Sequence, residues 1–326
     1  MPQSSGQAMK MGVGLYGDYG HQIAGKLVDH PHFYLAGYSH IAAGSLPPGL
    51  LRSSTGMAAE SLDELLKNPA VKLVSLCSSR RADQAMLAMQ CLHAGRHVLA
   101  EKPCAMNPAE LDMLMTTALE ARLVLREMAN DIGWQQPYLA LRRVIESGRI
   151  GTVLQVFVQK SYPMHGGRPD DEERDGGLML QCAGHCLRMI EQVAGKRIEF
   201  IDGVEICRPG QSSGLRIAAS LMMRLECGAT AAAVANYLNP PAFGLWGNEH
   251  LRVFGSDGMV EIIDGGQYTR LYANGTVSAL LQDEPGKDQL DLLVEEIQRG
   301  INRDDLERQL HPTRMAMAAR VAARQR

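Results

Sequence analysis

Two different rhythms of apolar and polar residues divide the chain. From Met11 to about Met128, short continuous apolar runs such as MGVGLY, FYLAGYS and VKLVSLC alternate with segments whose apolar residues recur at helical spacing. Strands that are apolar throughout are buried on both faces, which is typical of a parallel sheet covered by helices. The pattern predicts a doubly wound α/β domain whose helical segments include residues 21–30, 81–95 and 108–121.

The second rhythm begins after about residue 150. Longer strand-like runs such as TVLQVFVQKSY, GLRIAASLMMRLEC and GATAAAVANYL follow one another, and turn signals such as ECGA and GSDG separate several of them. Such turns are typical of antiparallel hairpins. One helical stretch, GGLMLQCAGHCLRMIEQVAG, precedes most of these strands, and two more close the chain. We therefore expect an α+β domain with a large open, mostly antiparallel sheet.

Length and charge limit the class of protein. The 326 residues exceed one average domain, so we expect two domains, residues 1–128 and 129–326, with the C-terminal helix a candidate to pack back on the first. A formal net charge of −3 gives no broad basic surface for nucleic acid. No apolar run reaches the ~20 residues of a membrane span, and the first ten residues lack a signal-peptide core. With seven cysteines in no framework spacing, we expect a cytoplasmic protein without disulfides.

The first strand leads into a candidate phosphate-binding turn. Gly12, Gly14 and Gly17 match a dinucleotide-binding glycine motif by spacing, but MGVGLY is itself the strand. A phosphate-binding turn follows a strand and opens a helix, so we assign the turn to residues 17–21. Tyr19 and Gln22 stand where the second and third glycines are usual. The predicted cofactor-binding residues here are Gly17, Asp18, Tyr19, Gly20 and His21.

The end of the second predicted strand bears on the choice of dinucleotide. It reads AGYSH, without the acidic residue that accepts hydrogen bonds from the adenosine ribose in NAD sites. Ser39 and His40, with Arg52 nearby, are compatible with a 2′-phosphate, and equally with plain loop positions. We predict NAD or NADP, with a slight preference for NADP, and Ser39 as a cofactor contact.

The segment HAGRHVLAEKPCAMNPAEL places an apolar strand before Glu101-Lys102-Pro103 and opens a helix at Asn107-Pro108. In this context the tripeptide resembles that of the Gfo/Idh/MocA family of nicotinamide-dependent oxidoreductases, named for glucose-fructose oxidoreductase and inositol dehydrogenase. The resemblance continues through LALRRVIESGRIGTVLQVFVQ and DGGLMLQCAGHCLRMI and covers essentially the whole chain. It implies a Rossmann-type N-terminal domain, Glu101 and Lys102 beside the cofactor, and a homodimer or homotetramer formed through the C-terminal sheet.

The resemblance also implies the catalytic residues. Oxidising a secondary alcohol needs a base within hydrogen-bond reach of the hydroxyl while hydride leaves the same carbon, and Lys102 and His185 take these places. The family has Asp four residues before this His and often three residues after it, where this chain has Gln181 and Arg188. Either Lys102 and His185 suffice and Gln181 aligns the substrate, or the site has lost hydride chemistry.

Three further features of the sequence bear on the site. After the third strand the family usually has Thr-Pro, whereas this chain reads CSSRRADQ; Ser78 offers a hydroxyl there, and Arg80 or Arg81 either meets a phosphate or is solvated. The loop SYPMHGGRPDDEERDGG makes His165 and Arg168 candidate substrate contacts or parts of a solvated lid. Zinc on Cys182, His185 and Cys186, completed by His165, is disfavoured because free cysteines are commonly buried small hydrophobes, and we expect no metal.

Together these observations predict an NAD(P)-dependent oxidoreductase that transfers hydride between nicotinamide and a sugar, inositol or related polyol. Two alternatives stay open. A ligand-binding or regulatory protein on the same scaffold would keep the fold without turnover. An enzyme similar to the family's NAD-dependent glycosidases would hold its cofactor tightly and show no net reduction of it.

Overall fold

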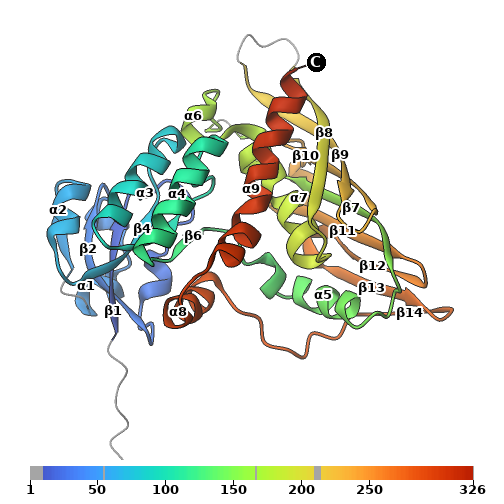
Figure 1. The fold of residues 1–326 in the computed structure, drawn as a ribbon, viewed down its shortest axis with the longest axis horizontal. Coiled ribbons are helices and arrows are strands. Elements are labelled where there is room, and N and C mark those ends of the chain that lie inside the picture. The colour runs from blue at the N-terminus through green and yellow to red at the C-terminus, as the bar shows by residue number, and fades with distance from the viewer. Residues whose placement is uncertain (1–9, 54–55, 166, 209–213, 326) are drawn as a thin grey trace, which may run out of the picture. The chain divides into compact units, whose positions relative to one another are not determined.

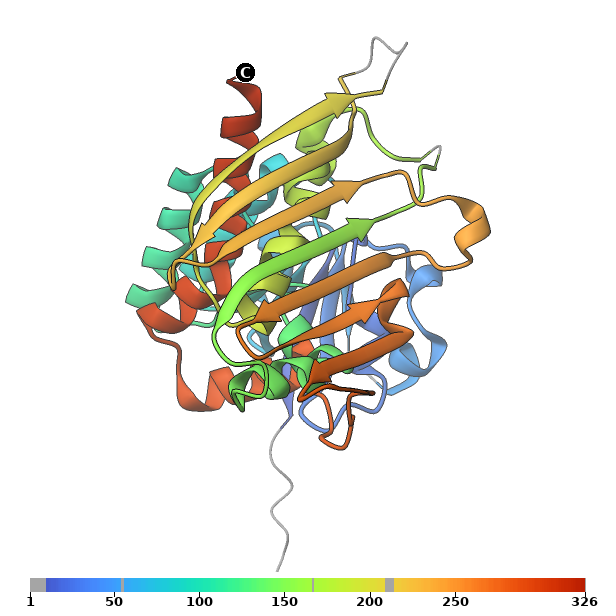
Figure 2. The same ribbon diagram turned by 90° about the vertical axis from the view of Figure 1, so that its right-hand side faces the viewer.

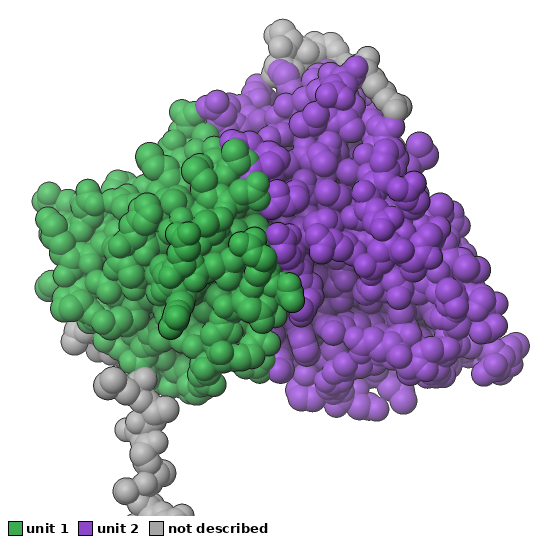
Figure 3. Space-filling view, in the orientation of Figure 1, with its two compact units in different colours: residues 1–105, 109–129, 293–306 green, residues 106–108, 130–292, 307–326 purple. Residues whose placement is uncertain are grey.

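The computed structural model (Figure 1) describes residues 10–53, 56–165, 167–208 and 214–325, except for the side chains of residues 52 and 53. The chain forms two compact units, shown in Figure 3. Unit 1 contains Met1–Ala105, Ala109–Ala129 and Leu293–Leu306, and unit 2 contains Met106–Pro108, Asn130–Leu292 and Glu307–Arg326. No helix within the described ranges is long and apolar enough to cross a membrane.

Unit 1 is built on a six-stranded sheet of order β3-β2-β1-β4-β5-β6 in which every neighbouring pair is parallel. This is the strand order of the dinucleotide-binding Rossmann fold. Val13 and Leu15 in β1 and Leu73 and Val74 in β4 are completely buried, so both faces of the central strands are covered, as the sequence predicts. The strands are β1 Met11–Tyr16, β2 Phe33–Ser39, β3 Met57–Ala59, β4 Val71–Leu76, β5 His97–Ala100 and β6 Leu125–Glu127.

Helices cover this sheet, but the prediction of a helix over residues 21–30 is wrong. Only a four-residue 3-10 turn, Ala24–Leu27, forms after β1. The backbone is extended at Val28 and left-handed at Asp29, with φ of +53°, and Gly25 inside the turn is a poor helix former. The turn after β1 is therefore followed by a single helical turn. The helices that do form are α1 Pro48–Ser53, α2 Leu62–Lys67, α3 Gln84–His93, α4 Pro108–Ala121 and α8 Gln289–Arg299, whose last seven residues lie in unit 1.

Unit 2 is built on an eight-stranded sheet of order β14-β13-β12-β11-β7-β10-β9-β8 (Figure 2). Only β7 and β10 pair in parallel, and every other neighbouring pair is antiparallel, which confirms the prediction. The strands are β7 Val153–Ser161, β8 Ile198–Cys207, β9 Arg216–Leu225, β10 Thr230–Asn236, β11 Asn248–Gly255, β12 Gly258–Ile263, β13 Tyr268–Ala273 and β14 Thr276–Ser278.

The two faces of this sheet differ. In β9, Leu221 and Met223 are buried while Met222 between them is 66% exposed. In β8, Phe200 and Val204 are also about half exposed, at 52% and 50%. One face therefore belongs to the core of unit 2, whereas the other carries large apolar side chains at the surface.

The helical stretch predicted before most of these strands forms with an irregular geometry. The helix α7 Gly184–Arg188 is flanked by two π-helical segments, Met179–Ala183 and Met189–Val193. Such widened turns frequently occur at functional sites. The remaining helices of this part of the chain are α5 Tyr138–Glu146, α6 Glu172–Asp175 and α9 Arg303–Arg324.

Candidate active site

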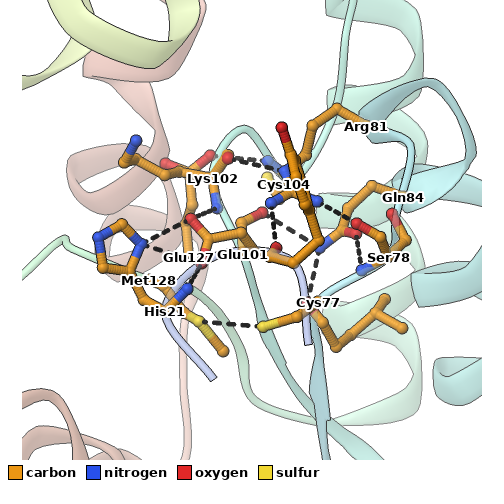
Figure 4. Close-up of polar contacts among 12 residues, drawn as sticks. His21, Cys77, Ser78, Arg81, Gln84, Glu101, Lys102, Cys104, Glu127 and Met128 are labelled. Carbon is orange, nitrogen blue, oxygen red and sulfur yellow. Dashed lines mark hydrogen bonds and ion pairs between the residues drawn. The ribbon is translucent and has the colours of Figure 1, made fainter. Parts of the chain in front are cut away.

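The candidate cofactor-binding residues of unit 1 lie where the parallel strands end. The loops after β1, β4 and β5 meet there, as Figure 4 shows, and they carry the turn at residues 17–21, Ser78 and the pair Glu101-Lys102. Strand order reverses between β1 and β4, and ligands of doubly wound sheets bind outside the carboxyl ends at such a point. The structure thus brings together the segments that the sequence assigns to the cofactor, although they lie far apart along the chain.

Two glycines shape the turn after β1. Gly17 has φ of +69° and Gly20 has φ of +125°, values that L side chains rarely adopt. A Cβ on Gly17 would lie 2.1 Å from the Cys77 carbonyl oxygen, and a Cβ on Gly20 would lie 2.4 Å from a Glu101 carboxylate oxygen. The turn is therefore a close-packed backbone surface, and the residues present fit the approach of a dinucleotide phosphate.

Gln22 replaces the third glycine of the usual motif and fixes the turn by its side chain. Its Nε2 donates to the Gly17 carbonyl at 2.8 Å, and its Oε1 accepts from the Ser75 hydroxyl at 2.5 Å and from the Ile23 N–H at 2.9 Å. The side chain ties the turn to β4. This substitution changes how the turn is held and leaves its backbone surface in place.

Glu101 connects this turn to Lys102. Its buried carboxylate accepts from the backbone N–H of His21, lies 2.9 Å and 3.0 Å from His21 Nδ1, and accepts from the Lys102 N–H at 3.1 Å. Burial by itself raises the pKa of Glu101, but the hydrogen bond and charge of His21, then Lys102 and Arg81, outweigh it and lower that pKa to about 2. Glu101 is therefore a fixed negative charge at neutral pH.

Replacing Glu101 by Gln is expected to flatten the acid dependence of stability. The pKa of this carboxyl falls from 4.5 to about 2 on folding, so its contribution is present above about pH 4.5 and is lost as the pH falls toward 2. Because His21 is half exposed, we expect that contribution to be on the order of 2 kcal/mol. Urea denaturation at neutral and acidic pH measures it, with exposed Glu120→Gln as the control. Parallel curves for wild type and Glu101→Gln would contradict the expectation.

Arg81 holds the three loops together. It is 3% exposed, and its guanidinium donates to the carbonyls of Lys102 at 3.0 Å, of Tyr19 at 2.6 Å and of Ser78. The interpretation of Arg81 as a solvated charge is therefore wrong. Gln84, completely buried, adds bonds to the Leu76 and Glu101 carbonyls and was not singled out by sequence.

Lys102 itself is 2% exposed, and Figure 4 shows its side chain extending away from Arg81. Both ends of its peptide are held, since its N–H donates to Glu101 and its carbonyl accepts from Arg81. The backbone on both sides of the Lys102 side chain is thus fixed. This arrangement suits a group that must meet one particular atom of a ligand.

The two serines assigned to the cofactor are turned toward the protein. Ser39 is 1% exposed and its hydroxyl lies 2.9 Å from His40 Nδ1. Ser78 is 3% exposed and its hydroxyl donates to the Arg80 carbonyl. The Arg52 side chain falls outside the described residues, and Asp18 is exposed. The preference for NADP stays a prediction.

In unit 2, the candidate catalytic residue His185 lies in α7 and is 9% exposed. Its ring meets the Tyr162 ring edge-on, with centroids 6.2 Å apart. Trp246 lies 6.1 Å from Tyr162 and 5.6 Å from His165 by ring centroids. These four rings form an aromatic cluster in which Tyr162 is the ring that contacts His185. The cluster is built from α7, the loop after β7 and the loop before β11, and sequence reasoning named only its two histidines. Gln181 lies in the π-helical segment before α7 and is partly buried.

The cysteines beside His185 face the sheet. The Cys182 thiol contacts the Lys160 carbonyl at 3.5 Å and the Cys186 thiol contacts the Val234 carbonyl at 3.7 Å. His165, the fourth ligand of the zinc alternative, is exposed. Among the described residues, no group of three or more His, Cys, Asp or Glu is placed to hold a metal ion.

Fold and site together define a two-unit nucleotide-binding α/β protein. Residues 13–128 match the family model described as oxidoreductase family, NAD-binding Rossmann fold, and residues 138–261 match that of the GFO/IDH/MocA C-terminal domain. The chain therefore belongs to the Gfo/Idh/MocA oxidoreductase family, as the motif at Glu101-Lys102-Pro103 predicts.

Known relatives support this assignment. Myo-inositol 2-dehydrogenase of Thermotoga maritima is 27% identical over 231 residues, which cover 68% of this chain and 63% of that enzyme. A 3-ketoreductase from Actinomadura kijaniata, in complex with NADP, shares the fold with a TM-score of 0.77 at 17% identity, covering 96% of this chain and 98% of its own. A protein of gentamicin A biosynthesis in complex with NAD also has a TM-score of 0.77, at 17% identity and 99% and 97% coverage.

Proposed function

We propose that this protein is an NAD(P)-dependent oxidoreductase that transfers a hydride between nicotinamide and a sugar, inositol or related polyol. The observation that carries the proposal is the buried pair Glu101-Lys102, held against a glycine turn at the point where strand order reverses. Membership of the oxidoreductase family and the named activity of the Thermotoga maritima relative support it.

The bound nicotinamide would supply the hydride acceptor. This chain's residues would do the rest: Lys102 Nζ would take the proton of the reacting hydroxyl, and His185 would assist it. Gln181 would align the substrate, since its amide can donate and accept hydrogen bonds but does not ionise at neutral pH and so cannot serve as an acid or a base. The backbone at residues 17–21 would face the pyrophosphate.

Two finer statements belong to the same proposal. The Ser39–His40 pair at the end of β2, which lacks a carboxylate, supports a slight preference for NADP over NAD. The exposed apolar side chains of β8 and β9, among them Phe200, Val204 and Met222, support self-association through the outer face of the unit 2 sheet. We therefore propose a homodimer or homotetramer.

Titration of the purified protein with NADH and then NADPH tests the proposal. We expect micromolar binding of at least one, seen as energy transfer from tryptophan to the reduced nicotinamide and checked by calorimetry. Gly20→Val should abolish it, because a side chain there meets the Glu101 carboxylate, while exposed Gly44→Val should not.

The result decides between the candidate functions. Binding followed by turnover of a polyol supports the dehydrogenase. If the folded protein binds neither cofactor, hydride transfer is excluded and a ligand-binding role on the same scaffold takes its place. Cofactor that stays on the protein through purification, with no net reduction during turnover, points to a glycosidase-like reaction.

A further inference from the structure

Arg168 occupies an unusual position in unit 2. Its guanidinium carbon lies 3.5 Å from the centroid of the Tyr237 ring. Tyr237 is 1% exposed and directly follows β10, so the ring is a rigid base for the arginine. Stacking of this kind fixes the guanidinium plane and leaves its N–H groups directed outward around the edge.

Arg168 makes few hydrogen bonds for an arginine whose guanidinium is stacked on a buried ring. Its Nη2 donates to the Pro163 carbonyl at a long 3.4 Å, and its buried Nε makes no hydrogen bond to the described residues. The buried Tyr237 hydroxyl also has no hydrogen-bond partner there. Buried polar groups are nearly always satisfied, so these two side chains together indicate a polar group that binds from outside the chain.

Arg168 makes no direct ion pair in the part of the chain that the structure describes, although the charge of Asp175 reaches the Tyr237 ring on which Arg168 stacks. Within the described ranges, no carboxylate lies at ion-pair distance from its guanidinium. Glu249 pairs with Lys160, and Asp175 accepts from the Gly177 N–H at 2.9 Å. The other acids of this loop are Asp170, Asp171, Glu172 and Glu173, of which Asp171 caps α6 and Glu172 pairs with Arg324.

Arg168 also shares its surroundings with the proposed catalytic histidine. Tyr162 is the common neighbour, since its ring meets His185 edge-on. Burial raises the pKa of Tyr162, and the positive charges of Arg168 and Arg188 oppose that rise. Arg168 also donates to the carbonyl of Pro163, the residue that follows Tyr162, so it lies beside this aromatic cluster. The cluster is suited to a ligand that carries a negative charge close to its reacting hydroxyl.

We propose that the substrate is a polyol acid, a sugar or polyol bearing a carboxylate, and that Arg168 binds this carboxylate. A guanidinium and a carboxylate are both planar and form two parallel hydrogen bonds, and one stacked arginine matches one monoanion. A dianionic phosphate calls for more donors. The proposal rests on the proposed function for the reaction, but the binding of the acid by unit 2 is a separate property.

Calorimetry on the whole protein, with and without NAD(P)+, tests this with matched pairs of ligands. The pairs are D-glucuronate with D-glucose and D-gluconate with D-glucitol, and D-glucose 6-phosphate is the phosphate arm. We expect each carboxylate to bind at least about tenfold more tightly than its neutral partner. That preference should weaken as salt is added.

Variants of two nearby arginines separate the role of Arg168 from general effects. Arg168→Met should remove the preference while affinity for the neutral ligands stays, and Arg168→Lys should restore part of it. Arg174→Gln, which changes an exposed arginine in the nearby helix α6, should keep the full preference. Circular dichroism confirms that each variant is folded.

Four results would overturn the proposal: equal affinities within both pairs, an unchanged preference in Arg168→Met, tighter binding of the phosphate than of either acid, or no binding of either acid. The NADH and NADPH titrations run in parallel. A carboxylate preference without cofactor binding would sink the hydride-transfer proposal alone, and cofactor binding without the preference would sink the polyol-acid proposal alone.

Discussion

Lys102→Met is expected to lower kcat by about 10²- to 10⁴-fold, the range by which a positioned acid-base group accelerates proton transfer. Methionine approximates the length of lysine but has no group that can take up or release a proton. Because Arg81 and Glu101 hold the Lys102 peptide on both sides, the neighbouring backbone should not move. We expect the affinity for NAD(P)H to stay within about threefold of wild type, so that the loss appears in kcat. The change in NAD(P)H absorbance with a turned-over polyol measures the rate.

Two matched variants make this result specific. Lys67→Met removes an exposed lysine of the same unit and should leave the rate unchanged. Lys102→Arg keeps the positive charge but provides a group that does not deprotonate at working pH, so it should be nearly as slow as Lys102→Met. Full activity in Lys102→Met would exclude the proposed mechanism. An equal loss of cofactor affinity would make Lys102 a binding group instead.

The fold could be predicted largely because the burial of each strand determines which of its residues are apolar. β1, which is covered on both faces, is apolar throughout, whereas β9 alternates because one of its faces is exposed. The prediction of a helix over residues 21–30 was wrong for a local reason. Its apolar spacing is helical, but the left-handed conformation at Asp29 ends the segment after one turn, and periodicity does not report backbone conformation.

The site was predictable only where a motif marks it. Glu101-Lys102 and His185 stand in recognisable segments, and the sheet brings the first pair to the glycine turn. No motif marks Arg81. Its guanidinium binds three carbonyls, but in the sequence it cannot be distinguished from a solvated charge at the start of a helix. The stacking of Arg168 on Tyr237 joins a loop to the end of a distant strand, and only tertiary packing reveals it.

Arg126→Met is expected to destabilise the protein by about 3–5 kcal/mol, as for other buried ion pairs that lose one partner. Arg126 in β6 is 3% exposed, and its Nη1 lies 2.5 Å from Glu296 Oε1 in α8. Both residues belong to unit 1, so the pair fastens the returning segment Leu293–Leu306 to the Rossmann sheet. Burial raises the pKa of Glu296, and the charge of Arg126 opposes that rise. Without Arg126 the carboxyl must either stay buried and charged or take up a proton.

The double variant Arg126→Met with Glu296→Met distinguishes a broken pair from lost packing. Removing both charges removes both desolvation penalties, so we expect it to be more stable than either single variant. Urea denaturation at neutral pH measures all three. Arg224→Met, which breaks the exposed pair of Arg224 in β9 with Glu199 in β8, should change the free energy of unfolding by no more than about 0.5 kcal/mol. If Arg126→Met were as mild as Arg224→Met, the returning segment would be held by apolar contacts of α8, and the ion pair would contribute nothing to fastening it.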